Sequence, residues 1–258
     1  MKNAKVFIVG AGPGDPGLLT MKAAECLRKA DVVVYDRLVS EEILGFIPRH
    51  AEMIFAGKAA RDHAMPQDEI NQTLVDLAKQ DKIVVRLKGG DPFIFGRGSE
   101  EALMLAEHDI NFEIVPGITA SAGCGAYAGI PLTHRGLATG VRFVTGHCRD
   151  GHHLDLNWAS LACPETTLVI YMGLINIEKI SAELIKAGLP ADTPAAGVER
   201  GTTPDQRTVI TTLEKLPETL AKAELKAPSL LIIGKVVDLA DVISWKTHAH
   251  ESLLNEPS

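Results

Sequence analysis

The segment that most constrains the fold is a run of strand-forming residues followed directly by a glycine-rich loop. Residues 83–87 (Ile-Val-Val-Arg-Leu) are mostly β-branched or apolar, which predicts a buried strand of a parallel sheet. The next segment, 88–101, holds four glycines and then begins a helix pattern with Ser99 as its predicted N-cap. Glycine permits sharp turns and close approach of a ligand to the backbone. Because open α/β sheets bind ligands at the carboxyl ends of their strands, we expect a binding site here; a tight structural turn is the alternative.

Strand and helix patterns alternate on both sides of a segment rich in small residues, 116–139. In the first half, strands are predicted at 5–9, 31–35, 52–56, 83–87 and 111–115, with helices at 18–29, 66–79 and after Ser99. In the second half, strands are predicted at 141–145, 167–172, 195–199, 207–212 and 230–234, with helices at 177–187 and 213–223. Repeated βα units imply a parallel sheet covered by helices. The prediction is an α/β fold of two α/β domains, 1–130 with a parallel sheet and 131–245, followed by a flexible tail at 246–258.

Composition is that of a globular protein. Of the 258 residues, 46% are hydrophobic and 23% are charged, which allows a substantial core. No apolar run is long enough to span a bilayer, and the first residues lack the apolar segment of a secretory signal. The cysteines, Cys26, Cys124, Cys148 and Cys163, form no CxxC pair, which favours a reducing compartment. We therefore expect a cytoplasmic protein without a membrane span.

The net charge limits the partners of the chain. A formal charge of −7 and a pI of about 5.7 argue against nucleic acid and anionic membranes. An anionic small molecule stays compatible with this charge, because salt screens exposed charges beyond about 8 Å. A local group of arginines, lysines and histidines can bind an anion whatever the overall sign.

A second glycine-rich loop, 10–17 (Gly-Ala-Gly-Pro-Gly-Asp-Pro-Gly), also follows a strand and precedes a helix. Its position suggests a dinucleotide site, with Asp36 at the end of the next strand as the ribose-binding acid. However, Asp15 occupies the third glycine position and would repel phosphate, and Pro13 and Pro16 lack the N–H groups that bind a pyrophosphate. The loop disfavours an NAD-dependent oxidoreductase or a nucleotide-binding regulator. It fits a ligand without phosphate, or a structural turn.

Asp36 and Lys58 each follow a predicted strand. An acid and a lysine at strand ends can exchange protons with a substrate when burial or neighbouring charges tune them. A solvent-exposed salt bridge is the commoner role of such residues. The residues by themselves leave both roles open.

Six segments resemble, in the same order, the motifs of the tetrapyrrole methylases. They are VGAGPGDPGLLT (9–20), ADVVVYDRLVS (30–40), KGGDPFIFGRGSEE (88–101), VPGITASAGCGAYAGIPLTHR (115–135), VTGH (144–147) and YMG (171–173). The resemblance covers nearly all of residues 4–245. Within the family it is strongest for the enzymes that methylate uroporphyrinogen III.

The resemblance implies C-methylation of uroporphyrinogen III at C2 and C7 by S-adenosylmethionine (SAM), which gives precorrin-2. It implies the class III methyltransferase fold, with SAM in the cleft between two α/β domains. No metal is needed, because the sulfonium already activates the methyl group. The chain resembles the stand-alone form of these enzymes rather than the fused sirohaem synthases. The sequence leaves open whether the product serves sirohaem, cobalamin or haem d1 biosynthesis.

The resemblance also assigns residues to roles. Contacts with SAM are assigned to Pro13, Gly89, Gly90, Asp91, Ile94, Thr119, Ala120, Met172 and Gly201. The catalytic residues are Asp36 as proton acceptor, Lys58 as proton donor, and Arg97. Substrate contacts are assigned to Arg97, Glu100 and Arg135. The assignment is chemically coherent, because small residues expose backbone for SAM and guanidinium groups bind the carboxylates of uroporphyrinogen III at two points.

The family forms homodimers, and the sequence contains a feature that fits one. The segment 40–65 carries several large apolar residues, more than a short connector needs: Ile43, Leu44, Phe46, Ile47 and Phe55. We interpret them as part of a dimer interface.

Two alternatives stay open. One is a sister enzyme on the same fold that acts on a later corrin intermediate or on ribosomal RNA; the acidic pI, Arg97 and Arg135 count against RNA. The other, of a different class, is an NAD-type oxidoreductase or a nucleotide-binding regulator, which Pro13, Asp15 and Pro16 disfavour.

Histidines and one cysteine of the second half are also candidate metal ligands. His147, Cys148, His152 and His153 lie close in sequence, but their spacing fits no established zinc pattern, so no metal is expected.

Overall fold

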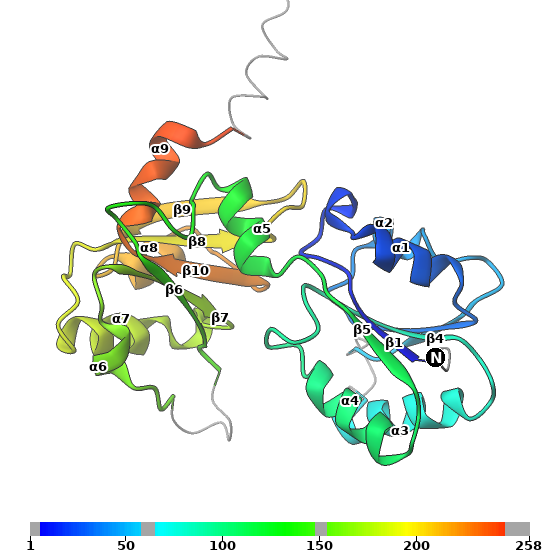
Figure 1. The fold of residues 1–258 in the computed structure, drawn as a ribbon. Coiled ribbons are helices and arrows are strands. Elements are labelled where there is room, and N and C mark those ends of the chain that lie inside the picture. Colours follow the sequence, from blue (N-terminus) through cyan, green and yellow to red (C-terminus); the bar gives the residue numbers. More distant parts are fainter. Residues whose placement is uncertain (1–5, 58–64, 148–153, 246–258) are drawn as a thin grey trace, which may run out of the picture. The chain divides into compact units, whose positions relative to one another are not determined.

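The computed structural model describes residues 6–57, 65–147 and 154–245. Contacts divide the chain into two units, Met1–Ala120 and Ser121–Ser258, each built around one five-stranded sheet (Figure 1). The predicted α/β fold is confirmed. The predicted boundary after residue 130 lies somewhat further along the chain than this division. Helix α5 (Ala120–Tyr127) accounts for the difference, because its Ser121 amide donates to the Tyr171 hydroxyl of the second unit at 3.0 Å.

The sheet of the first unit is parallel, as predicted. Its strands are β1 (Val6–Gly10), β2 (Val32–Tyr35), β3 (Glu52–Phe55), β4 (Val84–Lys88) and β5 (Phe112–Val115), in the order β3-β2-β4-β1-β5. Every neighbouring pair of these strands runs parallel. The carboxyl ends of the strands therefore meet at one edge of the sheet, which is the edge that binds ligands in open α/β folds.

Helices cover both faces of this sheet (Figure 1). They are α1 (Met21–Arg28), α2 (Glu41–Leu44), α3 (Gln67–Ala78) and α4 (Gly98–Glu107), with a short 3₁₀ turn, η1 (Pro16–Leu18). On the face covered by α3 and α4, Leu74 packs in one cluster with Val84 of the central strand. On the face covered by α1 and α2, Leu27 packs in a second cluster with Val85. Successive side chains of a strand point to opposite faces, so β4 directs its even-numbered residues toward α3 and α4.

The start of α4 differs from the prediction. The helix begins at Gly98, Arg97 occupies the N-cap position with a φ of 59°, and no side chain caps the helix. The predicted N-cap role of Ser99 is therefore wrong. The preceding loop closes tightly, because the Gly98 amide donates to the Pro92 carbonyl at 3.0 Å. This closure starts the helix earlier than a serine cap would.

The second unit has a mixed sheet. Its strands are β6 (Gly140–Thr145), β7 (Thr166–Tyr171), β8 (Pro194–Glu199), β9 (Arg207–Thr212) and β10 (Ser229–Ile233), in the order β6-β7-β10-β8-β9. The β6–β7 pair is parallel, whereas the pairs that join β10 to β7, β10 to β8 and β8 to β9 are antiparallel. The predicted strands of this half are confirmed within a residue or two at each end.

Helices also surround the second sheet. Besides α5 they are α6 (Trp158–Leu161), α7 (Ile177–Lys186), α8 (Leu216–Lys222) and α9 (Ala240–Ile243), with 3₁₀ turns η2 (Leu174–Asn176) and η3 (Lys235–Leu239). One face packs on α7 and α8, where Ile180, Leu184 and Leu220 share a cluster with Leu231 of β10. The longest described helix, α3, has 12 residues, and none of those described has the length and hydropathy needed to cross a bilayer.

The apolar residues of segment 40–65 belong mainly to the core of the first unit. Ile43 is fully buried, and Leu44 and Ile47 pack against the same cluster. The Phe55 ring lies 5.4 Å from the Tyr35 ring. Phe46, at 42% exposure, is the clearly exposed member of the set. Most of these residues therefore belong to the core, and the set is not the exposed apolar surface that we expected for a dimer interface. The homodimer stays a prediction.

Candidate active site

Most predicted site residues lie at the carboxyl edge of the first sheet. The loops after β1, β2, β4 and β5 and the first turns of α4 and α5 carry Pro13, Asp36, Gly89, Gly90, Asp91, Ile94, Arg97, Glu100, Thr119 and Ala120. Lys58, the predicted proton donor, lies outside the described residues. The parallel arrangement thus brings residues that are far apart in sequence to one side of the unit.

A short antiparallel bridge between Gly12 and Gly90 joins the loops after β1 and β4. The Gly90 amide donates to the Gly12 carbonyl at 2.7 Å, and the Gly12 amide donates to the Gly90 carbonyl at 3.1 Å. Both glycines have positive φ, +78° at Gly12 and +69° at Gly90, where a side chain is strained. A Cβ at Gly90 would meet nothing closer than the Ala120 amide nitrogen at 3.9 Å. Gly90 therefore presents bare backbone beside open space.

Other glycines at this edge are required because backbones pack against each other. A Cβ at Gly10 would lie 2.6 Å from the Gly117 nitrogen, and one at Gly117 would lie 2.3 Å from the Gly90 carbonyl oxygen. A Cβ at Gly89 would lie 2.6 Å from the Cβ of Leu38. Gly89 is therefore required by internal packing, and its predicted contact with SAM stays a prediction. The packing roles of Gly10 and Gly117 were not predicted, because they appear only when the loops are assembled.

Asp91 fixes the shape of the loop after β4. Its Oδ1 accepts a hydrogen bond from the Phe93 amide at 2.9 Å, and its Oδ2 accepts one from the Gly117 amide at 3.1 Å. Both oxygens are thus engaged within the unit, and the carboxylate ties this loop to the loop after β5. The predicted contact of Asp91 with SAM stays a prediction.

Arg97 and Glu100 form a two-point ion pair at this edge. Arg97 Nε lies 2.9 Å from Glu100 Oε1, and Nη2 lies 2.7 Å from Oε2. The hydrogen bond to Glu100 raises the pKa of Arg97, and the same bond lowers the pKa of Glu100. Both side chains are accessible, at 56% and 48% exposure. A carboxylate on a ligand can reach this guanidinium fork by displacing Glu100.

Asp36 follows β2 and is joined to a group of buried charges. Arg86 Nη2 donates to Asp36 Oδ1 at 2.6 Å. Arg86 and Lys88 of β4 and Glu101 of α4 are all buried and linked to one another. These three residues were not among the predicted site residues. The signal that could have found them is a pair of cations at alternate positions of an otherwise apolar strand.

The second unit carries the other predicted residues. Because β7 and β8 are both antiparallel to β10, Met172 after β7 and Gly201 after β8 lie at the same edge of the second sheet. Met172 is 50% exposed. Arg135 is exposed, in a turn that precedes β6. The structure thus brings Met172 and Gly201 to one edge of this sheet.

Left-handed backbone at non-glycine residues is concentrated near the predicted sites. The residues concerned are Phe95 (φ 54°), Arg97 (59°), Met172 (54°), Arg200 (46°) and Thr202 (70°). The other described non-glycine residues with positive φ follow helices α3, α4 and α8, where left-handed residues are common; they are Asp81, Asp109 and Glu224. Strained backbone of this kind costs on the order of 1–3 kcal/mol per residue and clusters at functional sites. The strain supports the assignment of function to these loops.

Gly201 is required by its contact with α5. A Cβ there would lie 2.1 Å from the Cys124 sulfur. Burial raises the pKa of the Cys124 thiol to about 12, so this cysteine stays neutral and is unsuited to act as a nucleophile.

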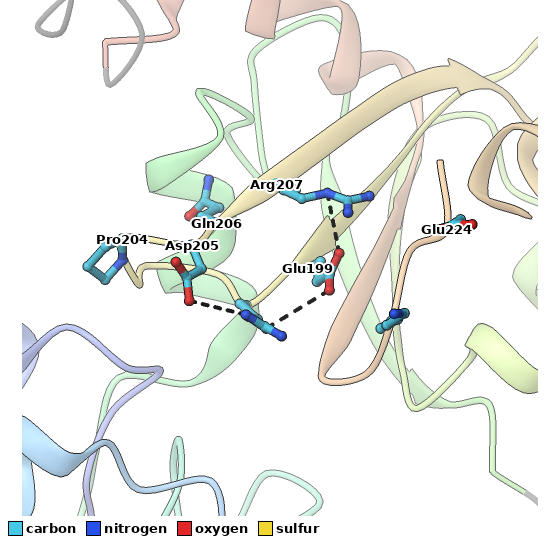
Figure 2. A pocket seen from close by; sticks show the side chains of 8 residues that line it. Glu199, Pro204, Asp205, Gln206, Arg207 and Glu224 are labelled. Carbon is cyan, nitrogen blue, oxygen red and sulfur yellow. Dashed lines mark hydrogen bonds and ion pairs between the residues drawn. The ribbon is translucent and has the colours of Figure 1, made fainter. Parts of the chain in front are cut away.

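A polar cavity of about 450 Å³ opens near the ends of β8 and β9 (Figure 2). It is lined by Glu199, Arg200, Pro204, Asp205, Gln206, Arg207, Glu224 and Lys226. Four of its charged residues form ion pairs with one another: Arg207 Nε lies 3.5 Å from the buried Glu199, and Arg200 Nη1 lies 3.1 Å from Asp205. None of the predicted site residues lines this cavity, so we assign no function to it.

Among the described residues, no three histidine, cysteine or carboxylate side chains are grouped so that they could hold a metal. Of the cluster weighed above, Cys148, His152 and His153 lie outside the described residues. The absence of a metal stays a prediction.

Comparison with known proteins extends these observations. Residues 5–217 match the family of tetrapyrrole (corrin/porphyrin) methylases. The chain is 56% identical, over 244 residues, to a siroheme synthase of Pseudomonas putida; the alignment covers 95% of this chain and 52% of that protein. The chain thus spans about half the length of the curated relatives it matches.

Solved structures are similar over nearly their whole length. A uroporphyrin-III C-methyltransferase of Thermus thermophilus, complexed with S-adenyl homocysteine, has a TM-score of 0.79 and 43% identity, and the match covers 92% of this chain and 100% of that one. A cobalt precorrin-4 methyltransferase of cobalamin biosynthesis has a TM-score of 0.80 and 30% identity, and the match covers 90% and 95% of the two chains.

Proposed function

Because the chain belongs to the tetrapyrrole (corrin/porphyrin) methylase family, we propose that it is a SAM-dependent C-methyltransferase that converts uroporphyrinogen III to precorrin-2. It methylates C2 and C7 of the substrate. The observation that carries this proposal is the 43% identity to the Thermus thermophilus uroporphyrin-III C-methyltransferase, across the whole of that chain. The siroheme synthase relatives favour sirohaem biosynthesis among the three routes open to precorrin-2.

SAM suits the chemistry of the glycine-lined edge. It supplies a methyl group that its positively charged sulfur already activates. It has no phosphate, so the acidic Asp15 does not exclude it as it would exclude a dinucleotide. The open space beside Gly90 lets a ligand approach the backbone. The residues assigned to SAM are Pro13, Gly89, Gly90, Asp91, Ile94, Thr119, Ala120, Met172 and Gly201.

In the proposed reaction, a pyrrole carbon of the substrate forms a bond to the methyl carbon while the carbon–sulfur bond breaks. The electron pair of that bond stays on sulfur, and S-adenosylhomocysteine leaves. The methylated ring has gained the positive charge of the sulfonium and returns to neutrality by losing a proton. Asp36 accepts this proton, because its carboxylate lies partly exposed at the edge where the loops converge. Lys58 is the assigned proton donor; a proton that it gives to the ring is matched by a second proton lost, so each methylation still releases one proton overall. A second cycle methylates the second carbon.

The arginines hold the substrate. Uroporphyrinogen III carries acetate and propionate carboxylates around its rim, and a planar guanidinium binds a carboxylate at two points. Arg97 offers such a fork at the edge of the first sheet, and its present partner Glu100 is an exposed carboxylate that a substrate group can replace. Arg135 is the second proposed contact. Alignment of the nucleophilic carbon with the methyl group is the main contribution of these contacts.

The proposal predicts a specific product. Incubation of the purified protein with SAM and uroporphyrinogen III should give a tetrapyrrole whose mass has risen by two CH2 units, because each added methyl group replaces a proton, with two molecules of S-adenosylhomocysteine formed per substrate. Mass spectrometry and absorbance follow the product. A parallel reaction with a methylated corrin intermediate tests the sister activity suggested by the cobalt precorrin-4 methyltransferase. Methylation of that compound alone would contradict the assignment to uroporphyrinogen III.

We further propose a cytoplasmic homodimer. The cytoplasmic location follows from the cysteine usage, since Cys26, Cys124 and Cys163 are all free in the structure. Light scattering at micromolar concentration should give a mass of about twice 27.7 kDa. A single species at the monomer mass would refute the dimer.

A further inference from the structure

Three charged residues lie buried beneath the predicted proton acceptor, and the proposed roles do not include them. We call Arg86, Lys88 and Glu101 the buried charge cluster. Their exposures are 2%, 2% and 0%. Arg86 and Lys88 occupy alternate positions of β4, the central strand, so they face α3 and α4, and Glu101 comes from α4.

Glu101 is the hub of the cluster. Its Oε1 accepts from Arg86 Nε at 2.9 Å and from Lys88 Nζ at 2.7 Å. Gln67 Nε2 of α3 lies 3.3 Å from the same oxygen. The other oxygen, Oε2, has no hydrogen-bond partner among the described residues. One buried carboxylate therefore anchors two buried cations.

Burying charged side chains on a central strand costs free energy. Central strands of parallel sheets are normally apolar, and the same face holds Val84 and Leu105. Replacing buried ion pairs with well-packed apolar side chains is often neutral or stabilising, so stability alone does not explain these charges. A role in chemistry does, and the direction of the cluster indicates which residue it serves.

The cluster ends at Asp36. Arg86 Nη2 donates to Asp36 Oδ1 at 2.6 Å, and Lys88 Nζ lies 3.9 Å from Asp36 Oδ2. Asp36 is the member that reaches solvent, with its side chain 29% exposed. Arg86 therefore fixes one carboxylate oxygen, and the other is held less closely.

We propose that the buried charge cluster positions the Asp36 carboxylate for proton transfer, with Arg86 and Lys88 as positioning residues and Glu101 as their anchor. This inference rests on the proposed function only for the role of Asp36 in methylation. Among the described residues, the charges that face Asp36 are Arg86 and Lys88 from β4, with Glu101 from α4 behind them.

The charge balance makes the cluster sensitive to substitution. Two cations and two carboxylates, counting Asp36, give no net charge. Burial, and next the neighbouring Arg86 guanidinium, lower the pKa of the Lys88 ammonium, so its positive charge is maintained largely by Glu101 and Asp36. Loss of Glu101 removes the acceptor that both cations share, and it should therefore loosen the hold of Arg86 on Asp36.

The test removes one charge of the cluster at a time. Lys88→Met removes a cation that lies beside Asp36, and Glu101→Gln removes the charge that anchors both cations. Each should lower kcat by about tenfold, a part of what a well-placed general base contributes, while the SAM dissociation constant changes by less than about threefold. In the Asp36→Asn background the same substitutions should cost nothing further, because the cluster acts through Asp36. Carbon-13 NMR of the ligand-free protein at one fixed pH should show a displaced Asp36 carboxyl signal in each variant, with Asp36→Asn identifying that signal.

The chain offers matched controls. Lys82 and Glu52 form an exposed pair at 3.0 Å in the same unit, so Lys82→Met and Glu52→Gln make the same charge changes away from Asp36. Neither should lower kcat or displace the Asp36 signal. If Lys88→Met does not fold by circular dichroism, Lys88→Gln removes the charge while keeping an N–H donor for Glu101.

The outcomes are separable. An unchanged kcat in both Lys88→Met and Glu101→Gln overturns the inference. A loss of the same size in the Asp36→Asn background also overturns it, because the cluster would then not act through Asp36. Failure of the wild-type protein to methylate uroporphyrinogen III would refute the proposed function, and the Asp36 carboxyl signal in the variants would still decide whether the cluster positions Asp36.

Discussion

Arg97→Ala is expected to lower kcat/KM for uroporphyrinogen III by about ten- to a hundredfold, because a lost hydrogen bond to a charged group costs about 1.5–3 kcal/mol. The SAM dissociation constant should change by less than about threefold, since separate sites couple weakly. The structural basis is the accessible guanidinium fork, now paired with Glu100. Arg97→Lys should recover only part of the loss, because an ammonium cannot make the planar two-point contact.

Steady-state kinetics and a SAM titration on each variant test this division of roles. Lys222→Ala is the matched control, because Lys222 also forms an exposed ion pair, with Glu218 on α8, outside every predicted site. It should behave like the wild type in both assays. If Arg97→Ala lost SAM and kept its kinetics at saturating SAM, the site assignment would be inverted and would have to be withdrawn.

Gly90→Val should abolish SAM binding while the fold survives. Gly90 has a φ of +69° and borders open space, so valine would strain the backbone and fill the region assigned to the ligand. A left-handed residue with a side chain costs roughly 1–2 kcal/mol, which a folded unit of this size tolerates. Calorimetry with SAM measures the loss, and thermal unfolding shows that the fold is retained.

Gly188→Val separates the effect of strain from the effect on the site. Gly188 also has positive φ, +105°, and a Cβ there meets nothing within 4 Å, but it follows α7 away from the predicted residues. Both variants should lose a similar amount of stability, and only Gly90→Val should lose SAM. Normal SAM binding by Gly90→Val would mean that the loop is structural. A substitution at Gly89 is less informative, because a Cβ there would collide with Leu38 and disturb the packing of the unit itself.

The alternating pattern of the first half predicted its sheet because each strand is a short apolar run that a helix pattern follows. Parallel pairing then places the loops at one edge, and this brought the predicted Pro13, Asp36 and Gly90 together without any knowledge of contacts. The second sheet was less predictable. Its strands were located, but the antiparallel pairing of β10 with β7 and β8 depends on contacts distant in sequence.

Other features required the assembled structure. Arg86 lies within an apolar run, and only the register Val34 to Arg86 between β2 and β4 shows that it reaches Asp36. The need for glycine at Gly117 comes from a carbonyl of another loop. Ile43 looked like surface apolar area because the sequence does not reveal that its short helix packs on the sheet. Each of these depends on tertiary contacts between segments far apart in the chain.

The central claim is that glycine-rich loops at the carboxyl edge of the first sheet bind SAM rather than a dinucleotide. Isothermal titration calorimetry of the wild-type protein with SAM, S-adenosylhomocysteine, NAD and NADP tests it most directly. The account predicts saturable heats for SAM and S-adenosylhomocysteine and none for either dinucleotide, because Asp15 repels phosphate and Pro13 and Pro16 lack the N–H groups that bind it. Saturable binding of NAD or NADP without any heat from SAM would contradict the account.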